Sequence, residues 1–151
     1  MAELTWIQKH FADLTPDELY AVIRLRNEVF VVEQNCVFQD ADNKDQQCYH
    51  LLGYVGNELA AYARLVPPDV SYTGKTSIGR VITSPAHRRE GAGKALMTKA
   101  ITECNNIFGK FPIKIGAQLY LKKFYESFGF SQVGEEYDED GIPHIHMIKE
   151  R

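Results

Sequence analysis

The sequence predicts a single α/β domain in which helices pack on a mixed sheet. Its 151 residues suffice to bury a hydrophobic core, and 44% of them are hydrophobic and 25% charged, as in ordinary globular domains. No internal repeat or linker interrupts the chain. Strand-like and helix-like apolar patterns follow one another in the order β-α-loop-β-β-β-α-β-α-β-β. We therefore expect one domain over residues 1–151.

The first half of the chain predicts one helix among four strands. Residues 5–11 alternate loosely, as a strand does. Thr15, Pro16 and Glu18 form the pattern of a capping box, which predicts a helix that ends near Asn27. Residues 33–47 are polar, and within them 40–45 are predicted to form an exposed loop. Apolar runs predict strands over 48–55, 59–65 and 77–83.

Two helices and three strands are predicted in the second half. Apolar stripes predict helices over 93–108 and 119–128, and Gly129 closes the second one. A turn about Asp140 and Gly141 predicts a final hairpin. The predicted strands are 113–117, 131–137 and 142–149.

Charge and cysteine content exclude several classes of protein. A formal charge of -3 argues against a general affinity for nucleic acid. Cys36, Cys48 and Cys104 are odd in number and lack C-x-x-C spacing, which is typical of reduced thiols. The first ten residues lack a signal peptide's apolar run, and no apolar stretch is long enough to span a bilayer. We expect a cytoplasmic protein without nucleic-acid or membrane partners.

A strand, a glycine-containing loop and a helix start follow one another in residues 81–94. Backbone N–H groups at a helix N-terminus have no intrahelical partner and favour an anion such as phosphate. Gly91 and Gly93 would let a pyrophosphate approach those amides. Positive charge comes from Arg88, Arg89 and Lys94. The stretch therefore predicts an anion site, although a plain strand-to-helix turn with solvated arginines explains it too.

Two other phosphate motifs do not fit this loop. The dinucleotide fingerprint needs a third glycine where the chain has Leu96. A Walker loop needs a glycine in place of Arg88 and a hydroxyl in place of Ala95. Neither a dinucleotide fold nor a P-loop is predicted.

Two motifs resemble those of the GCN5-related N-acetyltransferases (GNAT). Arg88-x-x-Gly91-x-Gly93, after an apolar strand, resembles their R/Q-x-x-G-x-G/A motif. Residues 124–130, Phe-Tyr-Glu-Ser-Phe-Gly-Phe, are similar to their F-Y-x-x-x-G-F motif. Residues 26–34 and 139–145 resemble more narrowly the ElaA-like branch of the family. The chain departs from the family at Gln118, where many relatives have asparagine.

The resemblance implies an enzyme that transfers an acetyl group from acetyl-CoA directly to an amine, within a ternary complex and without a metal. It implies that the strand ending at Thr83 splays from the strand beginning at Ile113, so that pantetheine pairs with the free backbone. A backbone N–H near Ile82 or Thr83 would stabilise the oxyanion. The implied cofactor-binding residues are Val81, Ile82, Thr83, Arg88, Arg89, Glu90, Gly91, Ala92, Gly93, Lys94 and Gln118.

Candidate catalytic and acceptor residues also follow from the resemblance. Tyr125 matches the family's usual general acid, although its place in an apolar stripe is equally typical of a core tyrosine. Glu28 and Glu33 fall in a segment that commonly walls the acceptor pocket, where either could act as counter-charge or base. The histidines are further candidates for deprotonating the amine. Water-mediated deprotonation stays open. His50 or His144 could line the same pocket.

The acceptor amine, a small molecule or a protein, is not identified by the sequence. Loops 33–47 and 66–76 would form its pocket, and the acidic residues of 40–45 favour a cationic acceptor. Three alternatives stay open: an acetyl-CoA-sensing module, an acyl-homoserine-lactone synthase-like enzyme, and a metal protein built on Cys48, His50, His144 and His146. Dimers are common on this scaffold, so a homodimer is expected by analogy only.

Overall fold

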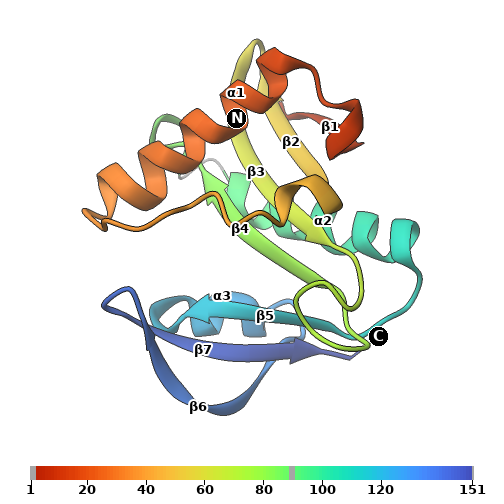
Figure 1. Ribbon diagram of the computed structural model, residues 1–151, viewed down its shortest axis with the longest axis vertical. Coiled ribbons are helices and arrows are strands. Elements are labelled where there is room, and N and C mark those ends of the chain that lie inside the picture. Colours follow the sequence, from red (N-terminus) through yellow and green to blue (C-terminus); the bar gives the residue numbers. More distant parts are fainter. Residues whose placement is uncertain (1–2, 89–90, 151) are drawn as a thin grey trace.

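The computed structural model describes residues 3–88 and 91–150, which form two antiparallel sheets side by side (Figure 1). The four-stranded sheet has the order β1-β2-β3-β4, with β1 Thr5–His10, β2 Tyr49–Val55, β3 Glu58–Val66 and β4 Ser77–Thr83. The three-stranded sheet has the order β5-β7-β6, with β5 Ile113–Gln118, β6 Ser131–Glu139 and β7 Ile142–Lys149. The predicted order of strands and helices is confirmed.

Among the described residues, the two sheets pair at one parallel bridge, between Thr76 and Ile113. There the N–H of Thr76 donates to the Pro112 carbonyl at 3.0 Å, and the N–H of Lys114 donates to the Thr76 carbonyl at 2.9 Å. Past this point β4 pairs only with β3, and β5 pairs only with β7. The strands β4 and β5 therefore diverge from a common origin.

A β-bulge interrupts β4. Tyr62 pairs with Ile82 while Arg64 pairs with Gly79, so one residue of β3 faces two of β4. Arg80 in the bulge has a φ of +50°, an uncommon conformation for a non-glycine residue. The extra residue explains why Ile78 and Ile82 pack on opposite faces of the sheet although they are four residues apart.

The helices that cover the sheets are α1 Pro16–Arg26, α2 Ala92–Phe108 and α3 Lys122–Glu126. The capping box predicted at the start of α1 is present, with both the Thr15 and Glu18 hydrogen bonds. A wide π-helical turn continues α1 over Asn27–Glu33, and such turns are frequent at functional sites. The helix predicted over 119–128 is shorter than expected, because its first turn, Leu119–Leu121, is a 3₁₀ helix.

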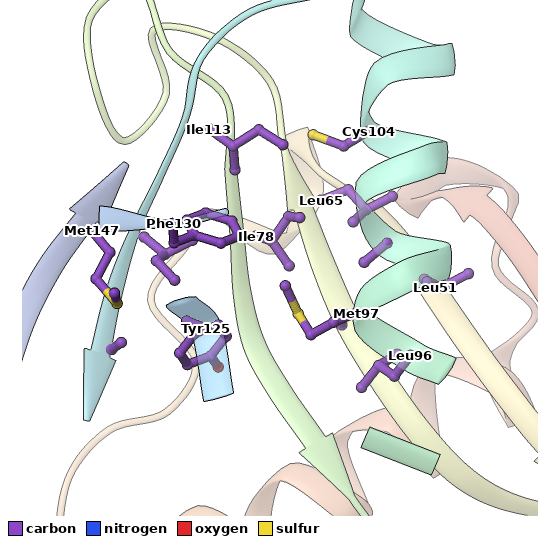
Figure 2. Close-up of a cluster of buried hydrophobic side chains, with 14 of the residues drawn as sticks. Leu51, Leu65, Ile78, Leu96, Met97, Cys104, Ile113, Tyr125, Phe130 and Met147 are labelled. Atoms are coloured by element: carbon purple, nitrogen blue, oxygen red, sulfur yellow. The ribbon is translucent and has the colours of Figure 1, made fainter. Parts of the chain in front are cut away.

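Two cores fill the space between these layers. The smaller lies between α1 and one face of the four-stranded sheet, and includes Val22 and Leu52. The larger lies on the other face, where α2, α3 and both sheets meet. Figure 2 shows Met97 of α2, Ile78 of β4, Met147 of β7 and the separate residue Phe130 gathered in this core. This core contains residues of both diverging sheets and so packs them against each other.

A network of ion pairs anchors the segment between α1 and β2. The arginines are Arg26, Arg64 and Arg80, and the aspartates are Asp40, Asp42 and Asp45. Arg26 is 1% exposed, and its Nε donates to Asp40 at 2.7 Å while its Nη1 donates to Asp45 at 2.9 Å. Arg64 donates to Asp42 and to Asp45, each at 2.8 Å.

This network corrects the expectation that residues 40–45 form an exposed acidic loop. Asp40 is buried, and the side chains of Asp42 and Asp45 are only 25% and 15% exposed. Three internal arginines neutralise these carboxylates, so the loop offers little negative charge to an acceptor.

In the part of the chain that the structure describes, no helix is long and apolar enough to cross a membrane.

Candidate active site

A cavity of about 610 Å³ lies where β4 and β5 diverge. Its walls come from Arg88 and Gly93 at the start of α2, the helical segment 120–125, β4 residues 78–83, β5 residues 115–118, the segment around the π-helical turn and the β6–β7 hairpin. The last two touch, because Cys36 Sγ lies 3.5 Å from the Asp140 carbonyl oxygen. The cavity is therefore walled by elements far apart in sequence.

The predicted strand residues Val81, Ile82 and Thr83 all line the cavity. One edge of β4 pairs with β3, whereas the edge toward β5 has no ladder partner beyond Thr76 among the described residues. An unpaired strand edge presents N–H and C=O groups to an extended ligand. Arg80 holds the bulge in place, because its Nε lies 2.8 Å from Asp40 and its Nη2 donates to the Asp40 carbonyl at 2.9 Å.

The N-terminus of α2 lies beside this strand edge. Gly91 is the N-cap, with a left-handed φ of 75°, and Ala92, Gly93 and Lys94 follow in the first turn. A Cβ on Gly93 would meet Phe124 at an ordinary 3.9 Å, so internal packing does not require a glycine here. The first-turn amides have no intrahelical acceptor and suit an anion. Arg89 and Glu90 lie outside the described residues.

Arg88 and Glu33 form a bidentate pair at the cavity. Nη1 and Nη2 of Arg88 donate to the two carboxylate oxygens at 2.6 and 2.7 Å, and Nη2 also donates to the Thr83 carbonyl at 3.2 Å. The hydrogen bonds and charge of Arg88 lower the pKa of Glu33, and Glu33 in turn raises the pKa of Arg88. Glu33 is thus a neutralised carboxylate with reduced basicity.

Tyr125 lies at the edge of the larger core and lines the cavity. Figure 2 shows its ring between β5 and β4, with the hydroxyl oxygen on the side away from Phe130. Burial raises its pKa to about 12. The structure gives this hydroxyl no hydrogen-bond acceptor or donor within residues 3–88 and 91–150. A protonated phenol is therefore available to a ligand.

His144 and Gln118 are cross-strand partners on β7 and β5, and both line the cavity. His144 is 7% exposed; its Nδ1 lies 2.8 Å from the Ile142 carbonyl oxygen and its Nε2 lies 3.4 Å from Glu139. Ala117 and Ile145, one residue away on each strand, face the core that holds Tyr125. The tyrosine and the histidine thus approach the cavity from opposite faces of the second sheet.

The other two predicted acceptor residues lie elsewhere. Glu28 is exposed on the π-helical turn, outside the cavity lining. His50 is 1% exposed in β2 of the first sheet. Its Nδ1 lies 2.6 Å from the Tyr62 hydroxyl, and its Nε2 lies 2.9 Å from the Asp45 carbonyl oxygen. Burial lowers its pKa. The structure brings Glu33 and His144 to the cavity, but neither Glu28 nor His50.

Sequence reasoning missed Arg80 and Glu139, which both line the cavity. Arg80 carries no motif, and its positive φ depends on the register with β3. Glu139 could have been noticed as the last strand residue before the predicted turn.

Within the described ranges, no three histidine, cysteine, aspartate or glutamate side chains are grouped so as to hold a metal ion. The histidines of the metal alternative lie in different sheets, His50 in β2 and His144 and His146 in β7.

The diverging strands, the glycine-capped helix and the cavity between them define the fold of the acyl-CoA N-acyltransferases. A protein with that description from Pseudomonas aeruginosa superposes with a TM-score of 0.93 at 43% identity, covering 97% of this chain and 99% of the other. The acetyltransferase (GNAT) domain family matches residues 12–151. The chain belongs to this family, in its ElaA-like branch.

Further comparisons agree with this assignment. Protein ElaA of Escherichia coli K12 is 45% identical over 149 residues, which cover 97% of each chain. Its crystal structure gives a TM-score of 0.92 at 44% identity, covering 98% of this chain and 100% of ElaA. A UPF0039 protein of Synechocystis is 42% identical and covers 97% of this chain and 95% of its own.

Proposed function

We propose that the protein transfers an acetyl group from acetyl-CoA directly to a primary amine in a ternary complex. The divergence of β4 and β5 carries this proposal, because it leaves a strand edge and a phenol without partners among the described residues, beside a helix N-terminus. Family membership supports an acyl-CoA donor. The acetyl group and the amine acceptor are parts of the proposal.

Each part of the donor has a matching surface. The edge of β4 from Gly79 to Thr83 pairs with the pantetheine amides. The first turn of α2, with Arg88 and Lys94, binds the pyrophosphate. A backbone N–H near Ile82 or Thr83 donates to the oxyanion, and such donors are worth about 3 kcal/mol in the transition state.

Tyr125 is the proposed general acid. Its raised pKa keeps it protonated near neutral pH, so it can give its proton to the departing thiolate. Glu33 is proposed as part of the acceptor wall together with Phe30 and Cys36. Its pair with Arg88 makes it a positioning group for the loop rather than a strong base.

Calorimetric titration with acetyl-CoA tests the donor site. Gly91→Asp adds bulk and negative charge at the helix N-terminus, and we expect acetyl-CoA binding to weaken at least tenfold. Gly56→Asp is the matched control, because Gly56 also has a left-handed φ, of 60°, and its Cβ would meet open space in the β2–β3 turn.

The control should bind like the unmodified protein, and circular dichroism should show both variants folded. Absence of binding to the unmodified protein would contradict the proposed reaction. Equal binding by both variants would contradict the placement of the phosphates.

A further inference from the structure

We propose that His144 is the base that takes the proton from the acceptor amine and that Glu139 positions it. This inference rests on the proposed acyl transfer. A primary amine with a pKa of about 10.4 is protonated at neutral pH and cannot attack a thioester until it loses a proton. The group that removes the proton must face the cavity on the acceptor side.

The hydrogen bonds of His144 determine where its proton lies. The Ile142 carbonyl can only accept, so Nδ1, at 2.8 Å, must carry hydrogen and donate. In the neutral ring Nε2 then has a free lone pair. That atom lies 3.4 Å from Glu139, a carboxylate that cannot donate to it. Among the described residues, Nε2 of the neutral imidazole therefore has no hydrogen-bond donor, and His144 lines the cavity.

Protonation completes this arrangement. With a proton on Nε2, the imidazolium donates to the Ile142 carbonyl on one side and pairs with Glu139 on the other. Glu139 thus lies where it can pair with the proton that Nε2 receives. Glu33 lies beside an arginine instead, because Arg88 stabilises its ionised form and lowers its pKa.

The groups around His144 are compatible with this role. On β6 they are Glu139 and Tyr137, whose ring lies 5.8 Å from the imidazole. On β7, His146 is the next residue on the same face. On β5, the facing residue Gln118 is uncharged. Within the described part of the cavity wall, both arginines are paired, Arg80 with Asp40 and Arg88 with Glu33.

Two groups at the cavity, His144 and Tyr125, account for the protons that move during the reaction. The ammonium gives one proton to Nε2 of His144, which later passes it to solvent. The neutral amine forms the C–N bond, and the C–S bond breaks as Tyr125 protonates the thiolate. The second proton of the attacking nitrogen restores the Tyr125 hydroxyl. Acid and base thus act from opposite faces of the second sheet.

Kinetics of His144→Gln test the inference, with His146→Gln as the matched control. His146 lies two residues along the same strand and the same face, and it stacks on Tyr137 outside the cavity lining. Acetyl-CoA consumption is measured with benzylamine, spermidine, lysine methyl ester and a tripeptide with a free N-terminus. For any amine turned over, we expect His144→Gln to lower kcat/KM about 100-fold at neutral pH with unchanged acetyl-CoA binding.

The pH profile separates a base from a structural residue. The unmodified protein should lose activity as pH falls, and this acidic limb should disappear in His144→Gln. Glu139→Gln removes the carboxylate that pairs with the imidazolium, so kcat/KM should fall while acetyl-CoA binding stays unchanged. A loss of similar size in His146→Gln, or an unchanged acidic limb in His144→Gln, would overturn the proposal.

The tautomer of His144 is a readout independent of turnover. Long-range ¹H–¹⁵N correlation spectra, assigned by the signals missing in His144→Gln, should show hydrogen on Nδ1 of the neutral ring. Hydrogen on Nε2 would overturn the inference. A protein that binds acetyl-CoA but acetylates none of the four amines would instead contradict the proposed function.

Discussion

Tyr125 and Tyr62 are both buried phenols, but their hydroxyls have different surroundings. Tyr62 is fully buried, and its hydroxyl lies 2.6 Å from Nδ1 of His50. Since Nε2 of His50 must donate to the Asp45 carbonyl, its Nδ1 accepts from Tyr62. Tyr125 has no such partner among the described residues and faces the cavity. One hydroxyl stabilises the fold and the other is free for chemistry.

Replacing each tyrosine by phenylalanine should separate these roles. Tyr125→Phe should lower kcat about 100-fold without changing acetyl-CoA binding, and should change the free energy of unfolding by less than about 1 kcal/mol. Tyr62→Phe leaves Nδ1 of His50 unsatisfied and should cost about 1–3 kcal/mol of stability with activity retained. Steady-state kinetics and urea unfolding measure both. Full activity in Tyr125→Phe would remove its role as general acid.

At the scale of elements, the segment between α1 and β2 is held by charge rather than by regular structure. Burial alone would raise the pKa of Asp42, but the hydrogen bonds and charge of Arg64 outweigh it and hold that pKa far below its usual range. For Asp45, burial is likewise outweighed, by Arg26 and Arg64, and the pKa is lowered. The network also holds Arg80, and with it the bulge of β4 at the cavity.

The pH dependence of stability should report this network. A carboxylate whose pKa is lowered by folding stabilises the protein above its unfolded pKa of about 3.9, and this contribution is lost as pH falls below that value. We expect the free energy of unfolding to decline between about pH 5 and pH 2. Arg64→Met should cost about 3 kcal/mol at pH 7 and should flatten that decline.

Arg24→Met is the control for the network, because Arg24 lies on the exposed face of α1. Urea unfolding at pH 7, 4 and 3 gives the comparison. An Arg64→Met variant with the same slope against pH as the unmodified protein would show that the arginine does not govern these carboxylates.

At the scale of the whole molecule, one core joins two sheets that share only a short backbone contact. Phe130 directly precedes β6 of the second sheet and is 2% exposed in that core, beside Tyr125. Trp6, the single tryptophan, lies on β1 at the far edge of the first sheet and packs against the same core. The shared core predicts that the sheets unfold together.

Phe130→Ala should therefore change the unfolding reported by Trp6. Removing a buried phenylalanine costs about 3–5 kcal/mol, and the midpoints from Trp6 fluorescence and circular dichroism should fall together. Tyr20→Ala, at a side chain 71% exposed on α1, is the control and should change little. A Trp6 midpoint that stays constant while circular dichroism changes would show that the second sheet unfolds independently.

Local patterns determined much of this protein from the sequence alone. The capping box of α1, the glycine turn at Gly141 and the glycine-capped start of α2 each depend on residues within a few positions of one another. Such interactions form wherever the chain places the right side chains close together. The order of elements and the family resemblance followed from them.

Only the tertiary structure decided which charged groups meet at the site. Arg88 finds Glu33 across 55 residues, and Cys36 contacts Asp140 across 104. The aspartates of 40–45 were expected to be solvated, because their arginine partners lie far away in the sequence, on α1, β3 and β4. The strength and basicity of a charged group depend on burial and on its neighbours, and neither is encoded within a short window of sequence. At the cavity, the divergence of β4 from β5 determined both the burial and the neighbours of the charged groups.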